Sequence, residues 1–99
     1  MYIEEIESEG QVQLNVEGRI DSICSQEFQD ALLKSFQKSN CVNVNMQNVD
    51  YISSAALRAF VLGQKTASSK GGKLTLYNVK PSVMTILTTT GFDSILTIR

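Results

Sequence analysis

The sequence contains no histidine, and its two cysteines, Cys24 and Cys41, lie far apart with no second pair. Histidine is the commonest general base at neutral pH and the commonest transition-metal ligand. Its absence excludes serine triads, cysteine–histidine dyads and zinc hydrolases. The cysteine pattern supports neither a zinc site nor a disulfide framework. We therefore expect no metal, no cofactor, and a reduced cytoplasmic compartment.

Long apolar runs, an excess of basic residues and a phosphate-binding glycine loop are also missing. The longest unbroken apolar runs span a few residues, whereas a membrane helix needs roughly 20. The net charge is −1 with both signs interspersed, so nothing indicates a nucleic-acid or phospholipid partner. Gly71 and Gly72 lead into an expected strand, not a helix. The aspartates have no spacing that pairs them, so we expect a protein that is not an enzyme.

What is present indicates one globular domain over residues 1–99. Hydrophobic residues make up 42% and charged residues 19% of the chain, which is ordinary globular composition. A chain of 99 residues is long enough for one core and too short for two. The acidic, alternating N-terminus resembles neither a signal peptide nor a transit peptide.

Apolar periodicity and the placement of glycine and proline predict the secondary structure. The expected strands are Tyr2–Ser8, Gln11–Val16, Cys41–Met46, Leu74–Val79 and a possible last short strand, Ser94–Ile98. A loop is expected over Gly18–Asp21. The expected helices begin at Asp21 or Ser22 and run to about Ser39, then span about Ser54–Ser69, and then about Ser82–Thr90 after Pro81.

This order of elements predicts a small single-domain α/β fold. We expect a mixed sheet of four to five strands with helices mainly on one face, because strand–helix–strand connections place parallel strands side by side. The first hairpin adds an antiparallel edge. The expected core comprises Phe28, Leu32, Phe36, Val44, Leu57, Phe60, Val61, Leu74, Leu76 and Leu87.

The segment Val42–Phe60 is the most informative part of the chain. A strand with alternating apolar residues gives way to a helix whose first residues include Ser53 and Ser54. A serine at such a position can accept hydrogen bonds from the free amides of the first helical turn. The same position also favours a phosphate group, because the helix N-terminus carries partial positive charge. Serine at this position is therefore compatible with two roles, a structural helix cap and a phosphorylation switch.

Five segments in order carry a family resemblance: GRID at Gly18–Asp21, the expected buried strand Cys41–Met46, YISSAAL at Tyr51–Leu57, Gly71–Leu74, and GFDSILTI at Gly91–Ile98. Together they resemble the STAS domain, in particular the small bacterial anti-sigma factor antagonists. The resemblance implies a STAS-like fold and a cytoplasmic partner-switching regulator of transcription. It implies binding to an anti-sigma factor serine kinase of the GHKL ATPase type, which phosphorylates the regulator, and dephosphorylation by a PP2C-type phosphatase.

The resemblance also assigns residues. Ser54 matches the phosphate acceptor, and Ser53 stands where many members have aspartate. Ala55 matches the family's small residue, and Ala56 replaces its usual glycine. Asp21 corresponds to an acidic loop residue of the family, and Asn45 to a polar residue near the end of the third strand.

Arg58 follows Ser54 by four positions, so it lies on the same helical face and could pair with a phosphate. Each of these residues also has a structural interpretation: Ser53 or Ser54 as a helix cap, Asp21 as a loop residue, Arg58 as a solvated surface charge. Two other functions stay open at this point. One is a non-phosphorylated STAS binding module that serves as a subunit of a transport or signalling complex. The other is a small enzyme or ligand-binding α/β domain.

Overall fold

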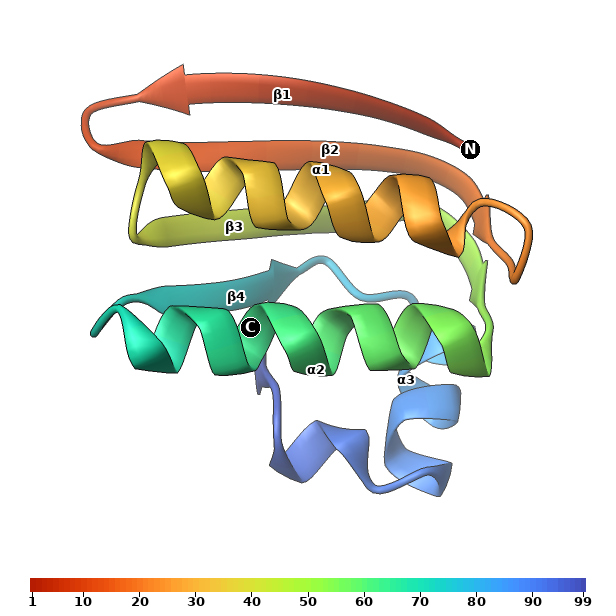
Figure 1. The fold of residues 1–99 in the computed structure, drawn as a ribbon. Helices are drawn as coiled ribbons and strands as arrows, with labels where there is room; N and C mark the ends of the chain where they lie inside the picture. Colours follow the sequence, from red (N-terminus) through yellow and green to blue (C-terminus); the bar gives the residue numbers. More distant parts are fainter.

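The computed structural model describes all residues from Met1 to Arg99, and Figure 1 shows their arrangement. Three α-helices, one 3-10 helix and five strands follow one another along the chain. Their bounds are β1 Tyr2–Ser8, β2 Gln11–Ile20, α1 Ser25–Lys38, β3 Cys41–Ile52, α2 Ser54–Ser69, β4 Lys73–Tyr77, α3 Pro81–Thr89, η1 Phe92–Ser94 and β5 Thr97–Ile98.

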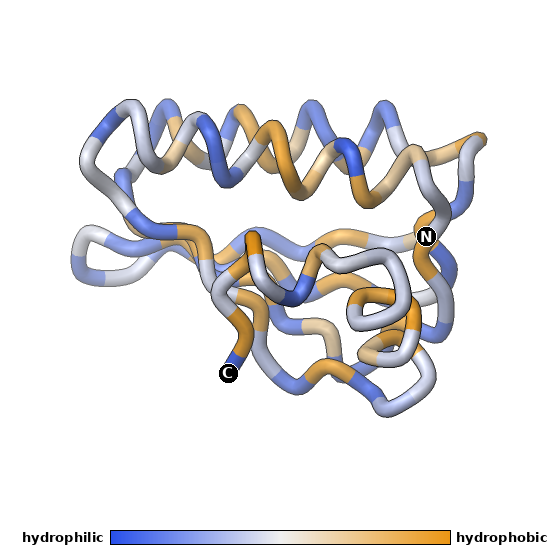
Figure 2. The backbone as a smooth tube through the Cα atoms, turned by 90° about the horizontal axis from the view of Figure 1, so that it is seen from below, coloured by the Kyte–Doolittle hydropathy of each residue, from blue (hydrophilic) through white to orange (hydrophobic).

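The strands form one mixed sheet in the order β1-β2-β3-β4-β5. β1 pairs antiparallel with β2, and all other neighbours are parallel. Helices α1 and α2 lie side by side in one layer over the sheet (Figures 1 and 2), and they pack against each other as well as against the strands beneath. The expected α/β fold with helices mainly on one face is confirmed.

The second and third strands are longer than the sequence pattern predicts. Gly18–Asp21 is not a loop, because β2 continues to Ile20, and β3 continues well past Met46 to Ile52. The register between the two strands shifts twice, between Asn15 and Glu17 and between Gly18 and Arg19. Such bulges break the strict alternation of apolar residues, so the pattern ends before the pairing does. Gly18 supports the irregularity with a φ of 96°.

The C-terminal strand is shorter than expected. β5 comprises only Thr97 and Ile98, because Gly91 ends α3 in the left-handed region and the chain then forms the 3-10 turn η1. Thr97 and Ile98 pair with Thr75 and Leu76 of β4. The last strand therefore closes the sheet with a short edge.

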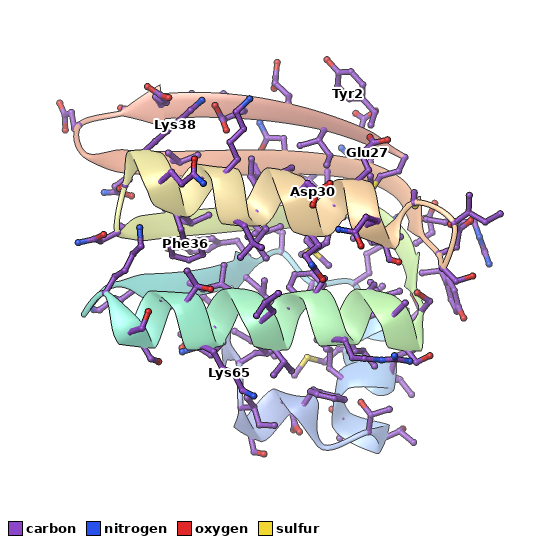
Figure 3. The ribbon with its side chains drawn as sticks, viewed as in Figure 1. Tyr2, Glu27, Asp30, Phe36, Lys38 and Lys65 are labelled. Atoms are coloured by element: carbon purple, nitrogen blue, oxygen red, sulfur yellow. The ribbon has the colours of Figure 1, made fainter.

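The hydrophobic core lies between the sheet and the layer of α1 and α2. Nine of the ten predicted core residues are buried; the exception is Val61, which is only half-buried. The buried stripe of α2 runs through Ala56, Leu57, Ala59, Phe60, Gly63 and Ala67, and Val61 lies beside that stripe. Phe60 packs against Phe28 of α1 with ring centroids 4.9 Å apart. Figure 3 shows the side chains of this layer, with Phe36 labelled.

Gly63 sets how closely α1 and α2 approach. A Cβ atom added at Gly63 would lie 2.5 Å from a methyl carbon of Leu32. The two helices therefore contact each other at a position where only glycine fits without displacement of the core.

Phe60→Ala and Val61→Ala test this packing as a matched pair. Phe60→Ala should lower the free energy of unfolding by about 3–5 kcal/mol, because it removes a fully buried ring and leaves a cavity. Val61→Ala should cost about 1 kcal/mol or less, since its side chain is half-buried. Urea unfolding followed by circular dichroism measures both. Equal losses in the two variants would contradict the orientation of α2.

Candidate functional site

The candidate site lies at one end of the sheet, where β2 and β3 end and α2 begins. Ile20 and Ile52 are paired neighbours at the ends of these two strands. The amide of Ser53 donates a hydrogen bond of 2.9 Å to the carbonyl oxygen of Ile20. Asp21 follows Ile20 directly and Ser54 follows Ser53 directly, so the structure brings Asp21, Ser53 and Ser54 to the same edge.

Ser53 is the N-cap of α2. Its Oγ accepts a hydrogen bond of 3.1 Å from the amide of Ala56, and its backbone carbonyl accepts one from the amide of Leu57. The residue is only 8% exposed. The hydroxyl of Ser53 is therefore committed to the start of the helix.

Ser54 is the first residue of α2, and its environment differs from that of Ser53. It is exposed, and its hydroxyl makes no hydrogen bond within the chain. The free amides of the first turn give this end of the helix partial positive charge. A phosphate on the Ser54 hydroxyl would therefore be tolerated by the helix and would project into solvent.

The residues after Ser54 divide between core and surface. Ala55 is half-buried, while Ala56 is fully buried and belongs to the core cluster. The extra methyl group of Ala56, relative to glycine, is therefore held within the protein instead of projecting from its surface. Arg58 is exposed and forms no ion pair within the chain. Its charge is available to a group on the same face of α2.

Asp21 closes the turn that leads into α1. One oxygen of its carboxylate accepts hydrogen bonds from the amides of Ile23 (3.0 Å) and Cys24 (3.1 Å). The hydrogen bond from the Cys24 amide is the main cause that lowers the pKa of Asp21 below its usual value. A carboxylate with a lowered pKa stabilises the fold above the pKa of the unfolded chain, and this contribution is lost as the pH falls through the lowered value.

Asn45 does not join this edge. It was expected near the end of the third strand, but β3 continues for seven more residues, which corresponds to roughly 20 Å of extended chain. Its Oδ1 accepts hydrogen bonds from the Gln47 amide and from the Asn78 side chain, both 3.1 Å long, and its Nδ2 donates to Asn15. Asn45 therefore belongs to a group of amide side chains in the middle of the sheet.

Two features of the edge were not predicted from the sequence. Ile23, in the turn closed by Asp21, is 90% exposed, the largest exposure among the large hydrophobic residues. Arg19 lies over the ring of Tyr51, with its guanidinium carbon 4.4 Å from the ring centroid. The sequence holds a signal for Ile23, because it falls outside the spacing of Phe28, Leu32 and Phe36 that forms the apolar stripe of α1.

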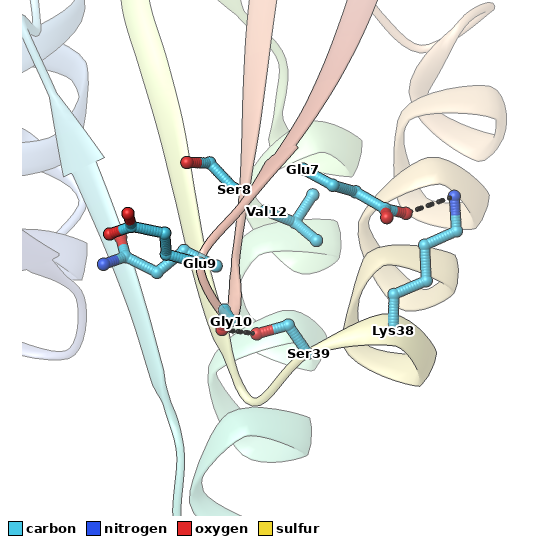
Figure 4. Close-up of a pocket in the computed structure, with 8 residues that line it drawn as sticks. Glu7, Ser8, Glu9, Gly10, Val12, Lys38 and Ser39 are labelled. Carbon is cyan, nitrogen blue, oxygen red and sulfur yellow. Dashed lines mark hydrogen bonds and ion pairs between the residues drawn. The ribbon is translucent and has the colours of Figure 1, made fainter.

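A separate hollow lies at the opposite end of the sheet (Figure 4), between the β1–β2 turn and the end of α1. Lys38 pairs there with Glu5 and Glu7, and the hydroxyl of Ser39 donates to the carbonyl oxygen of Gly10. The contact with Lys38 lowers the pKa of Glu5. These contacts fasten the hairpin to α1, so this hollow has a structural role.

No group of three or more histidine, cysteine, aspartate or glutamate side chains is placed to hold a metal ion. None of the helices combines the length and the apolar character that a membrane crossing requires.

Comparison with known proteins identifies what this arrangement resembles. The family model for the STAS domain matches residues 2–99. The anti-sigma-B factor antagonist of Bacillus subtilis (strain 168) is 25% identical over 92 residues, which cover 93% of this chain and 84% of that protein.

Two sets of solved structures share the fold. An anti-sigma factor antagonist from Mycobacterium paratuberculosis superposes with a TM-score of 0.86 at 14% identity, covering 98% of this chain and 83% of that one. The Bacillus protein SpoIIAA has been solved in its phosphorylated form, with a TM-score of 0.76 at 12% identity, covering 99% of this chain and 91% of that one. The anti-sigma factor antagonist SpoIIAA in its unphosphorylated form gives a TM-score of 0.77 at 13% identity, covering 99% and 87% of the two chains.

The two serines at the start of α2 should respond differently to truncation. Ser53→Ala should lower the free energy of unfolding by about 1 kcal/mol, because the Ala56 amide loses its hydrogen-bond acceptor. Ser54→Ala should change stability by less than about 0.5 kcal/mol, since its hydroxyl has no partner. Ser53→Asp is the control that restores a capping group. Chemical unfolding of the three variants measures this; a larger loss for Ser54→Ala would contradict the assignment of the cap.

Proposed function

Because the chain belongs to the STAS domain family, we propose that it acts as an anti-sigma factor antagonist-like partner-switching regulator. In this proposal it binds an anti-sigma factor serine kinase of the GHKL ATPase type. The kinase transfers a phosphoryl group from ATP to the Ser54 hydroxyl, and a PP2C-type phosphatase removes it by hydrolysis. The regulator itself is cytoplasmic, catalyses no reaction and binds no nucleic acid or membrane.

One observation carries the proposal: the two adjacent serines have separate environments. Ser53 is buried and caps the helix, whereas Ser54 is exposed with a free hydroxyl. A serine needed only as a cap would be engaged with the backbone. Ser54 has no such role, and its position favours a dianionic group. The existence of a phosphorylated form of SpoIIAA, which has the same fold, supports this interpretation.

The docking surface in this proposal combines the turn of Asp21 and Ile23 with the exposed start of α2. The two segments are joined through the hydrogen bond between Ser53 and Ile20. Ile23 offers an apolar anchor, and exposed apolar side chains beside polar ones are typical of protein interfaces. Ala55 and Arg58 extend the surface along α2.

Phosphorylation would act on this surface through charge. A phosphate adds nearly two negative charges where the partner meets a neutral hydroxyl. A carboxylate of the partner about 6 Å away would be repelled by roughly 3 kcal/mol for each unit charge at an effective dielectric constant near 20. That energy corresponds to about a hundredfold loss of affinity. Arg58, on the same face of the helix, would hold part of the phosphate charge within this chain.

The alternative is a STAS binding module that works without phosphorylation, as a subunit of a transport or signalling complex. The observation that favours it is the serine at position 53, where many members of the family have aspartate. This replacement removes one negative charge beside the acceptor. Labelling of the wild-type protein by its kinase separates the two functions.

Ser54→Ala and Ser54→Asp separate the switch from a passive helix end. Ser54→Ala should accept no phosphate and should bind the kinase constitutively, with wild-type affinity. Ser54→Asp should fold with wild-type stability, because aspartate suits a helix N-terminus, but should bind roughly tenfold or more weakly. Phosphate incorporation by the cognate kinase and calorimetric binding test both variants. Continued labelling of Ser54→Ala would move the acceptor to Ser53, and no labelling of wild type would favour the non-phosphorylated module.

Ile23→Ala tests the docking surface independently of phosphorylation. Binding of the kinase should weaken about tenfold or more, because truncation removes an apolar anchor. Stability should be unchanged, since Ile23 is 90% exposed in the free protein. The matched control is Ile95→Ala, which truncates a 51% exposed isoleucine near the C-terminus. Equal affinities of the two variants for the kinase would exclude the Asp21–Ile23 turn from the interface.

A further inference from the structure

The sheet has a second face, which points away from α1 and α2, and we call it the open face. Its residues alternate with the buried ones: Gln13 and Asn15 on β2, and Asn43 and Asn45 on β3. Parallel strands are usually covered on both faces, yet here β2 and β3 carry uncovered polar side chains on this face, while Thr75 of the next strand, β4, is buried at 5% exposure. The open face contains two shallow hollows of about 220 and 270 Å³, which share Gln13 and Asn43.

The strand register arranges the open face in three rows across β1, β2, β3 and β4. One row is Ser8, Gln11, Cys41 and Lys73; the next is Ile6, Gln13, Asn43 and Thr75; the third is Glu4, Asn15, Asn45 and Tyr77. The middle strands thus carry mainly amide side chains. The outer strands carry the exposed apolar groups, with Ile6 44% and Tyr77 37% exposed.

The amide side chains retain unused hydrogen-bonding capacity. Gln13 donates to Asn15 and Asn43 donates to Gln11, each over 2.8 Å. The side-chain oxygens of Gln13 and Asn43 accept no hydrogen bond within the chain. Each such group can both donate and accept, so a surface of amides can pair with a copy of itself.

The charges on the two sides of the open face have opposite signs. Every glutamate lies before residue 28, and Glu4 and Glu9 lie on the β1 side. Lys73 lies on β4, at the other side of the same rows. The α3 segment leaves the rows uncovered, since it begins beyond β4 and Lys80 binds Asp50 farther along β3.

From these observations we propose that the open face binds a second copy of this chain in a two-fold symmetric dimer. The axis runs parallel to the strands, between β2 and β3, so that β1 of each copy lies over β4 of the other. Gln13 then faces Asn43 of the partner subunit, and Glu9 approaches Lys73 of the partner subunit. An axis perpendicular to the strands would instead place β1 on β1, with acidic residues opposed. Two such sheets pack roughly 10 Å apart.

The area of the open face indicates how stable the proposed dimer should be. The rows span five residues on each of four strands about 4.8 Å apart, so they cover roughly 320 Å² in projection. This is a small interface, so we expect the dimer to be weak and reversible. The start of α2 lies at the strand ends, outside the rows, so Ser54 stays accessible. The dimer therefore does not depend on the proposed function.

Sedimentation velocity of the full chain, from about 10 µM to 1 mM, tests the proposal over the concentration range in which a weak dimer forms. The average mass should rise from monomer to dimer, and the amide side-chain NMR signals of Gln13 and Asn43 should shift with it. A monomer throughout that range overturns the proposal and leaves the open face to a different occupant or to solvent.

Exchanging the charges of Glu9 and Lys73 tests whether the open face forms the dimer interface. Glu9→Lys and Lys73→Glu should each weaken the dimer about tenfold, because each places like charges together, and the double variant should recover most of the loss. The matched controls are Glu27→Lys on α1 and Lys65→Glu on α2, both exposed and outside the rows (Figure 3), which should leave the dimer unchanged. A dimer that resists both single exchanges, or a double variant without recovery, overturns this arrangement. Circular dichroism confirms that the variants are folded.

Discussion

The hydrogen bond from the Ser53 amide to the Ile20 carbonyl is the constraint on which the candidate site depends. Ile20 is fully buried and Ser53 is nearly so, which shields this link from water. It continues the β2–β3 pairing by one step beyond Ile52, and so it fixes where both strands stop. The turn of Asp21 and the first residue of α2 must then emerge side by side. A surface made of two distant segments thereby gains a fixed geometry without any direct contact between their side chains.

Much of the fold could be predicted because its signals are local. Ser54–Ser69 was predicted with its correct bounds, since a capping serine precedes it and a glycine pair follows it. The ends of β2 and β3 could not be predicted in this way. Their last residues pair across bulges, where side chains change faces, and only the neighbouring strand determines that Val49 and Ile52 are buried. The exposure of Val61 likewise follows from the exact rotation of α2, which α1 fixes through Gly63.

Prediction of the candidate site from the sequence is limited in the same way as prediction of the strand ends. The sequence located Asp21, Ser53 and Ser54 as separate positions. The resemblance grouped them and matched Ser54 to the acceptor, but the residues alone could not distinguish the cap from the free hydroxyl. That distinction depends on which serine lies outside the helix, a matter of one residue. It also explains the serine at position 53: aspartate and serine are both good N-cap residues, so the exchange preserves the start of the helix while it changes the local charge. Asn45 was placed near the strand end by the resemblance together with the expected end of the strand at Met46, whereas β3 continues to Ile52.

The two faces and the two ends of the sheet have separate roles. The helical face holds the core, and the hairpin end is fastened to α1 by Lys38 and Ser39. The opposite end carries Ser54 at the start of α2, where, in the proposed function, a phosphate would change the charge of the surface with no need for the fold to move. The open face is distant from that end along the strands. Association through the open face would bring two Ser54 surfaces into one particle, and a partner with two binding sites would then bind with higher effective affinity than a monomer allows.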